Sequence, residues 1–392
     1  MALAEDWDAV LLLLEAVLLD GADGDLELAD RLIDLLEQLD GEEEEDNDGV
    51  QEPGEAAGYV RFDRTDPKWI DSKWRECFRF QKYDMDRLMA ALQLPDVMHN
   101  QSRKKRWSGF EGLCVVLYRL AYPCRLCEMR EIFGRPKSDL SEIFNSTLYF
   151  LHEHWSDLLV SLNHPWLSDE RLERYAEAIQ RKCPLGNVWG FIDGTVRPTC
   201  RPGVGQRLVY NGHKRVHALK FQSVVTPDGM IAHLYGPVEG RRHDAFLLAE
   251  SGLLHQLQGR MNRPNPDPGA PAVYSLYGDP AYPVSAYLLS PFRGLHLTPE
   301  QRQFNRELSA VRVAVEWEFG KLQTIFAFVD FKKNLKILLQ PVGMIYLVSG
   351  LLINCYKCLY GSQTAKFFSQ PEEGENAAPP MAAPLLEEYL QL

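Results

Sequence analysis

The chain has 392 residues, of which 45% are hydrophobic, as expected for a globular protein with two or three domains and a sizeable core. No apolar run reaches the length of about 18 residues that a membrane span needs, and the first residues lack the basic start of a signal peptide, so we expect no membrane association. The eight Cys are scattered without a dense framework, which favours a reducing compartment.

The net charge of −13 is divided unevenly along the chain. Residues 1–60 carry 20 Asp and Glu and one Arg, and removing their −19 leaves +6 for residues 61–392. A mildly basic body is compatible with nucleic-acid binding, and a solvated acidic tail on an ordinary enzyme explains the same pattern. We expect residues 1–60 to be an acidic extension, partly helical or disordered, with short helices at 5–20 and 25–40.

Residues 61–180 show helical periodicity and are predicted to be a helical region. Within it, Glu128–Asn145 reads as a short helix, a turn holding Gly134 and Pro136, and a second helix capped by Ser138. This is a helix-turn-helix pattern, in which DNA-binding versions place the second helix in the major groove.

Basic residues accompany this pattern. Arg135 and Lys137 lie in or beside the turn, where they are candidates for contacts to DNA phosphates. The cluster Arg103–Arg106 fits either a nuclear-import signal or a solvated loop.

From residue 187 the pattern changes to that of strands. Val188–Ile192 is an apolar run rich in β-formers, and it ends on Asp193 followed by Gly194. Burying an ionised Asp inside a sheet costs several kcal/mol unless it is paired. We therefore expect Asp193 at the carboxyl end of its strand, where open α/β sheets keep their ligand crevice.

The same pattern of strand and acid recurs downstream. An apparent antiparallel pair, 213–225 and 230–235, is joined by the turn Thr226–Gly229. His243-Asp244 then enters a helix, and a later strand at 273–277 is followed by Gly278-Asp279.

The last part of the chain is predicted to be helical and then disordered. Thr298 caps a long helix that reaches Leu322 and carries Glu316 beside its apolar stripe. Glu318 lies about 200° around the helix from Glu316, so both cannot serve one ion from the same face. A second apolar helix is expected at 339–360, and residues 362–392 are expected to be a disordered tail.

Asp193, Asp279 and Glu316 thus share a chemical logic. Carboxylates gathered in one place raise one another's pKa, so such a cluster persists when a divalent ion neutralises it. Mg²⁺ and Mn²⁺ accept such ligands, and two ions about 3.5–4 Å apart catalyse phosphoryl transfer. Surface acids balanced by nearby Arg or water are the alternative interpretation.

Several motifs in order resemble one family. Asp193-Gly-Thr, His243-Asp244, Gly278–Pro283 and Val315–Leu322 resemble the PIF/Harbinger group of DDE transposases, which includes domesticated nucleases. The resemblance covers roughly residues 187–354, and the preceding helical segment is similar to the same group's amino-terminal half. Two replacements depart from the usual pattern: Pro280-Ala281 in the second acidic motif and Trp317-Glu318 in the third.

The resemblance implies an α/β, RNase H-like catalytic domain over residues 187–361, with a mixed sheet flanked by helices. It places the catalytic and metal-binding triad on Asp193, Asp279 and Glu316, with two Mg²⁺ or Mn²⁺ ions as cofactors. His243-Asp244 is then near the active site, and Asp244 is a further candidate metal ligand. Further candidates for phosphate contacts are Arg241, Arg242, His243 and Lys214, besides Arg135 and Lys137.

Cysteine spacing offers one competing metal site. Cys124 and Cys127, and Cys355 and Cys358, are both CxxC pairs, which could form one zinc site or simply be core thiols.

Two functions follow from these observations. The first is a metal-dependent DNA endonuclease or transposase-like protein, which hydrolyses phosphodiester bonds by a two-metal DDE mechanism. The second is a domesticated, catalytically silent nuclear factor that binds DNA or protein. Both place the chain in the nucleus, with the cytoplasm as a further location, and leave open a Myb-like DNA-binding partner and a homo-oligomer.

Overall fold

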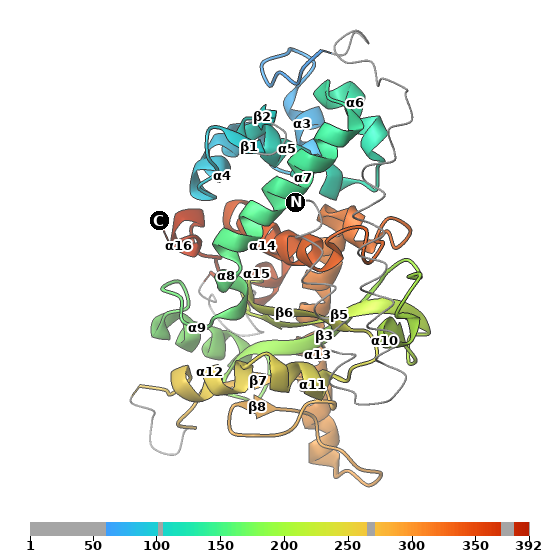
Figure 1. Cartoon of the computed structure of the whole chain (residues 1–392). Helices are drawn as coiled ribbons and strands as arrows, with labels where there is room; N and C mark the ends of the chain where they lie inside the picture. The colour runs from blue at the N-terminus through green and yellow to red at the C-terminus, as the bar shows by residue number, and fades with distance from the viewer. Residues whose placement is uncertain (1–59, 101–104, 265–270, 370–379, 392) are drawn as a thin grey trace.

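The computed structural model describes residues 60–100, 105–264, 271–369 and 380–391. The predicted acidic extension and the first half of the basic cluster at 103–106 lie outside these residues. Figure 1 shows a helical part, which holds the amino-terminal elements, above a part built on a sheet.

The helical region follows the predicted periodicity. Its longest helix, α7, runs from this region down to the sheet (Figure 1) and buries one face, including Leu140, Phe144 and Leu151. The elements are α3 (Asp71–Phe78), η2 (Lys82–Asp84), α4 (Met85–Ala91), β1 (Met98–Asn100), β2 (Lys105–Trp107), α5 (Gly109–Ala121), α6 (Leu126–Phe133), α7 (Lys137–Trp155), α8 (Asp157–Val160) and α9 (Asp169–Gln180).

The helix-turn-helix geometry is present as α6, a turn and α7. Gly134 ends α6 in the left-handed conformation, with φ of 60°, which Gly adopts without the penalty of a Cβ. The predicted cap is wrong, because α7 begins at Lys137 with Pro136 in the cap position rather than Ser138. The fixed φ of Pro136 suits the extended entry to the helix.

A mixed six-stranded sheet forms the second part, as the RNase H-like prediction requires. Its spatial order is β6-β5-β3-β7-β8, with β4 on the same edge of β5 as β6. β3 pairs antiparallel with β5 and parallel with β7. The elements are β3 (Val188–Pro198), α10 (Gln206–Val209), β4 (Tyr210–Asn211), β5 (Val216–Val225), β6 (Ile231–Glu239), α11 (Asp244–Glu250), α12 (Leu253–Arg260), β7 (Ser275–Tyr277), β8 (Leu288–Leu289), α13 (Pro299–Ile325), η3 (Ala327–Asp330), α14 (Val342–Tyr360), α15 (Gln363–Phe368) and α16 (Leu386–Tyr389).

β3 is longer than the sequence predicted. It continues five residues beyond Asp193 to Pro198, because β5 pairs with it along that whole length. The expectation that Asp193 ends its strand is therefore wrong. Asp193 lies inside β3, but β7 has already ended opposite Phe191, so one side of the strand is open at Asp193.

The two faces of the sheet are covered by different helices. Side chains alternate along a strand, so Phe191 and Arg197 lie on the face of β3 that also carries Asp193. Phe191 stacks on Phe368 of α15, and Arg197 lies over Tyr346 of α14. On the opposite face, α11 packs against β5 and β6, and Figure 1 shows α13 on the other side of the sheet from α11 and α12.

The helix α14 passes through the core. With a mean hydropathy of 1.5, it is long and apolar enough to cross a membrane. This differs from the expectation that no apolar run of the chain reaches that length. Of its apolar window, 78% is buried by the rest of the chain, as in the central helix of a globular domain. Its apolar character therefore comes from packing on β6, α7 and α13.

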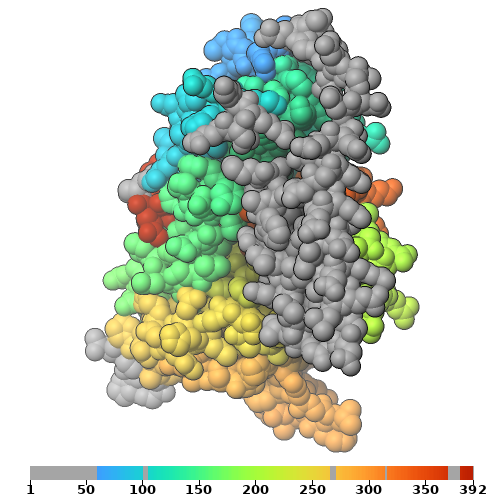
Figure 2. All heavy atoms as spheres, in the orientation of Figure 1, coloured from blue at the N-terminus to red at the C-terminus, as the bar shows by residue number. Residues whose placement is uncertain are grey.

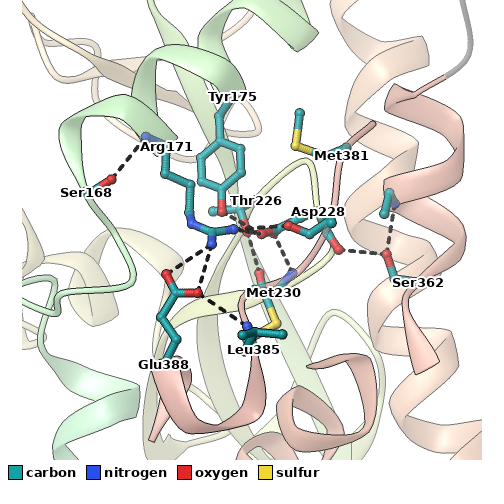
Figure 3. A network of polar contacts seen from close by, with 12 residues as sticks. Ser168, Arg171, Tyr175, Thr226, Asp228, Met230, Ser362, Met381, Leu385 and Glu388 are labelled. Atoms are coloured by element: carbon teal, nitrogen blue, oxygen red, sulfur yellow. Dashed lines mark hydrogen bonds and ion pairs between the residues drawn. The ribbon is translucent and has the colours of Figure 1, made fainter. Parts of the chain in front are cut away.

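The expectation of a disordered tail at 362–392 is wrong for the described residues of that segment. Ser362 caps α15, and Leu386 and Tyr389 of α16 are fully buried. Figure 3 shows Glu388 paired with Arg171 of α9, which in turn approaches Asp228 of the β5–β6 turn. The polar composition of this segment predicts that ordering it would cost too much conformational entropy. Its buried hydrophobic side chains and ion pairs offset that cost.

Candidate active site

The register of β3 and β7 brings Asp193 and Asp279 together. The last parallel pair of these strands is Phe191 and Tyr277, and an Asp follows each of them two residues later. The carboxylate of Asp193 faces α13, where Arg312 contacts it, and Asp279 is close enough to raise the pKa of Asp193. The two predicted acids are therefore neighbours in the fold, whereas their role as metal ligands stays a prediction.

The loop after β7 holds Asp279 tightly. A Cβ on Gly278 would lie 2.8 Å from both Ile192 and Tyr282, so only Gly lets the loop pack this close to β3. The N–H of Ala281 donates to Oδ1 of Asp279 at 2.9 Å. The unusual Pro280-Ala281 pair therefore still forms a side-chain turn that aims the carboxylate.

The two glutamates of α13 face opposite ways, as predicted. The side chain of Glu316 is 56% exposed and lies on the side of Asp193, whereas Glu318 is buried. Glu318 pairs with Lys357 of α14 at 2.8 Å and accepts from Thr364 at 2.6 Å. Glu318 is thus part of the core, and its place in the third motif does not alter the candidate site.

Arg312 is a site residue that the sequence reasoning missed. Its guanidinium lies 3.0 Å from Oδ2 of Asp193 and 3.5 Å from Oε1 of Glu316. It stands one helical turn before Glu316, and that i, i+4 spacing was the available signal. A single cation therefore connects two of the three predicted acids.

Burial raises the pKa of Asp193 to about 6. Arg312 and the N–H of Gly194 oppose this rise, while the neighbouring Asp279 and Asp244 add to it. The pKa of the buried Tyr282 is raised well above its usual value, first by burial and then by the carboxylates of Asp244, Asp193 and Asp279. Concentrated negative charge is therefore a property of this corner of the sheet.

Asp244 reaches the cluster from the opposite face. It begins α11 and sits so close to Gly194 that a Cβ there would lie 2.4 Å from the Asp244 carboxylate. Lys220 of β5 holds Oδ1 of Asp244 at 2.7 Å. This arrangement explains the Gly of the Asp-Gly motif, and it makes Asp244 the partner of Lys220 rather than a member of the triad face.

The donor set suits a hard divalent cation, but the side chains are not gathered around one point. Among the described residues, no three His, Cys, Asp or Glu side chains are close enough to hold a single ion. The guanidinium of Arg312 stands between Asp193 and Glu316, where a cation is needed. Carboxylate ligation by all three acids therefore requires Arg312 to move aside.

The candidate phosphate contacts fall into two groups. The guanidinium of Arg135 is held by both oxygens of Glu111, at 2.5 and 2.7 Å, so it is unsuited to the predicted role. Arg242 is held in the same way by Glu239 at 3.2 Å, and Arg241 lies beside it, partly buried. Exposed side chains form the second group, which comprises His243, Lys214 and Lys137.

The basic cluster and the cysteines add no second site. Lys105 forms ion pairs with Asp139 and Glu142 at the start of α7, so its ammonium group connects β2 to α7. All eight Cys are unpaired thiols, and none belongs to a metal-holding group among the described residues. Cys355 is buried as expected, whereas Cys127 is exposed.

Comparisons with known proteins agree with this geometry. Residues 192–354 match the model of the DDE superfamily endonuclease family. The chain is 23% identical over 266 residues to Protein ALP1-like of Arabidopsis thaliana. That alignment covers 66% of this chain and 63% of the relative's length. No solved structure matches. The predicted resemblance is thereby confirmed, since residues 192–354 are similar to the DDE superfamily endonucleases.

Proposed function

We propose that this protein is a divalent-metal-dependent DNA endonuclease whose ligands are Asp193, Asp279 and Glu316. The observation that supports the proposal is that the pairing of β3 and β7 ends two residues before Asp193 and Asp279, while Arg312 of α13 joins Asp193 to Glu316. Burial and the neighbouring Asp279 raise the pKa of Asp193 to about 6, so a bound divalent cation would stabilise its ionised form. Mg²⁺ and Mn²⁺ match an all-carboxylate site that leaves room for phosphate oxygens.

The chain's own residues would prepare the reaction. Asp193 and Asp279 are positioned by backbone pairing and by the turn after β7, so little reorganisation is required of them. Glu316 is exposed and can turn inward once Arg312 releases it, and the released guanidinium would be available to a DNA phosphate. Two bound ions would supply Lewis-acid stabilisation and activation of the attacking water.

One observation favours a second candidate, a catalytically silent DNA- or protein-binding factor. The acids Asp193 and Glu316 are already joined through Arg312, an arrangement that neutralises them without metal. If Arg312 stays in place, the site is a structural ion pair. The two candidates therefore differ in whether divalent ions displace Arg312.

The test is nicking of supercoiled plasmid by the purified chain in Mn²⁺, Mg²⁺ or EDTA, with Asp279→Asn as the matched variant. Metal-dependent nicking that disappears in the variant is expected. Metal-induced thermal stabilisation, measured in the same samples, separates the candidates when nicking is absent. No stabilisation by either ion in the wild type would count against the endonuclease.

Nuclear residence and help from a Myb-like partner or a second copy of the chain belong to the same proposal. They follow from a DNA substrate and from the weak positive charge of residues 61–392. A fluorescent fusion of the full chain that stays in the cytoplasm would contradict the nuclear location.

A further inference from the structure

Beside the acidic corner lies a stretch of chain with no acidic residue. Residues 194–227 contain six Lys and Arg and no Asp or Glu. Two of the six are internal: Arg197 is covered by aromatic rings and Lys220 is paired with Asp244. The other four are exposed, in a chain whose net charge is negative.

A second basic loop packs against this stretch. The N–H of Cys200 donates to the carbonyl of Leu335 at 2.8 Å, which places residues 331–336 beside Arg201. This loop carries three exposed Lys and again no acid. We call the combined surface the basic face, and it consists of Arg201, Arg207, Lys214, Arg215, Lys332, Lys333 and Lys336. None of these seven has a carboxylate partner among the described residues.

The basic face adjoins the candidate active site through ordered backbone. The side chain of Asn211 donates to the carbonyl of Gly240 at 2.7 Å, and the N–H of Arg241 donates to Leu208 at 3.3 Å. These bonds fasten the segment after β3 to the approach to α11, where Asp244 lies. Figure 1 shows α10 and the neighbouring loops projecting from one end of the sheet.

The length of β3 beyond Asp193 suits a polyanion that runs past the acidic side chains. From Asp193 to Pro198, β3 extends over five residues, or about 16 Å at a strand's rise per residue. That length matches about five base pairs of duplex, which carry about ten phosphate charges. Cations without carboxylate partners beyond the end of β3 would hold the backbone while the scissile phosphate reaches the acidic corner.

We propose that the basic face binds the phosphate backbone of duplex DNA on one side of the cleavage position. This inference rests on the proposed function, since it gives the substrate of that site a binding surface. Lys214 was already a candidate phosphate contact, and the other six residues are new. Each phosphate contact releases counterions, so seven contacts would give a log–log salt slope of about −6.

The experiment measures DNA binding without cleavage. Fluorescence anisotropy of a labelled duplex of about 30 base pairs is followed in EDTA between 50 and 200 mM salt, with the full chain. One variant is Lys332→Gln with Lys333→Gln and Lys336→Gln, and a second is Arg201→Gln with Arg207→Gln and Lys214→Gln. Each removes three charges and should weaken binding at least tenfold at 100 mM salt and reduce the slope by about 3.

A control removes the same charge elsewhere. Arg75→Gln with Arg174→Gln and Lys366→Gln changes three exposed cations on α3, α9 and α15. This control should keep the wild-type affinity and slope. Thermal melting with and without Mn²⁺ should be the same for all forms, which separates a loss of DNA binding from misfolding and from damage to the acidic site.

The proposal is overturned if both basic-face variants bind DNA as the control does. It is also overturned if the wild-type chain shows no salt-dependent binding, which would favour the chain's own acidic residues 1–60 as the occupant. The outcome is independent of nicking. Weaker binding in the variants without any nicking by the wild type would support the basic face and count against the endonuclease.

Discussion

Two aspartates, the buried Asp228 and the partly buried Asp193, show how differently a fold can treat one kind of residue. Asp228, in the β5–β6 turn, accepts from Tyr175 at 2.6 Å, Thr226 at 2.5 Å and the N–H of Met230 at 3.1 Å (Figure 3). Asp193 has the N–H of its own neighbour, Gly194, and one guanidinium, and it stands beside a second acid.

The difference separates a structural acid from a candidate functional one. The partners of Asp228 come from α9, the turn and the C-terminal segment, and they hold distant parts of the chain together. A fully satisfied buried network of this kind gives rigidity. Asp193 lacks such a set, and it shares its one cationic partner, Arg312, with Glu316. The following predictions test this contrast, from the largest expected effect to the smallest.

Removing the structural acid should be severe. Asp228→Ala leaves the hydroxyl of Tyr175 without its acceptor inside the core, removes one of the two acceptors of the Thr226 hydroxyl, and takes a nearby charge from Arg171. We expect the free energy of unfolding to fall by about 3–5 kcal/mol, measured by urea denaturation. Asp228→Asn keeps one acceptor oxygen and should lose less. A loss below about 1 kcal/mol in Asp228→Ala would remove the basis of the contrast.

The hairpin that carries Asp228 should also make stability depend on pH. Burial lowers the pKa of His233 in β6 to about 4, below the value of about 6.5 in an unfolded chain. The unfolded state therefore binds more protons in this window, and stability falls as the pH decreases from 6.5 to 4. The contribution is about 3 kcal/mol. His233→Gln should flatten this part of the stability–pH curve, and an unchanged curve would contradict the assignment.

Removing the candidate functional acid should not destabilise the metal-free protein. The pKa of Asp193 is raised in the folded state, so its ionisation costs stability as the pH rises above about 4 and through 6. At pH 8, Asp193→Asn removes this cost, and we expect the free energy of unfolding to increase by about 1 kcal/mol after the loss of the Arg312 pair. The same variant should abolish Mn²⁺-induced stabilisation. Destabilisation as large as that of Asp228→Ala would show that Asp193 is structural.

The smallest effect is expected at Arg312. If its guanidinium competes with metal for Asp193 and Glu316, Arg312→Gln should tighten Mn²⁺ binding three- to tenfold, as measured by calorimetry. Arg306→Gln, exposed on the same helix, is the control and should leave the affinity unchanged. Weaker Mn²⁺ binding in Arg312→Gln would mean that Arg312 supports the metal-binding arrangement.

Local patterns were sufficient for much of the fold. The turn Thr226–Gly229, the cap at Thr298 and the strand before Asp279 all lie where the sequence places them. The opposite faces of Glu316 and Glu318 followed from helical geometry alone. Errors occurred where another element decides the outcome. β3 continues past Asp193 because β5 pairs with it. The C-terminal residues are ordered because they form an ion pair with Arg171 and pack against the core.

By itself, the sequence determined the order of the acids, the strands and helices that carry them and the family that they resemble, because turns, caps and periodicity act over a few residues. Only the tertiary structure decided the register that aligns Asp193 with Asp279, the position of Arg312 between two acids, and the meeting of two basic segments at Cys200 and Leu335. These features join residues far apart in the chain. Their charges interact over distances that no local pattern encodes.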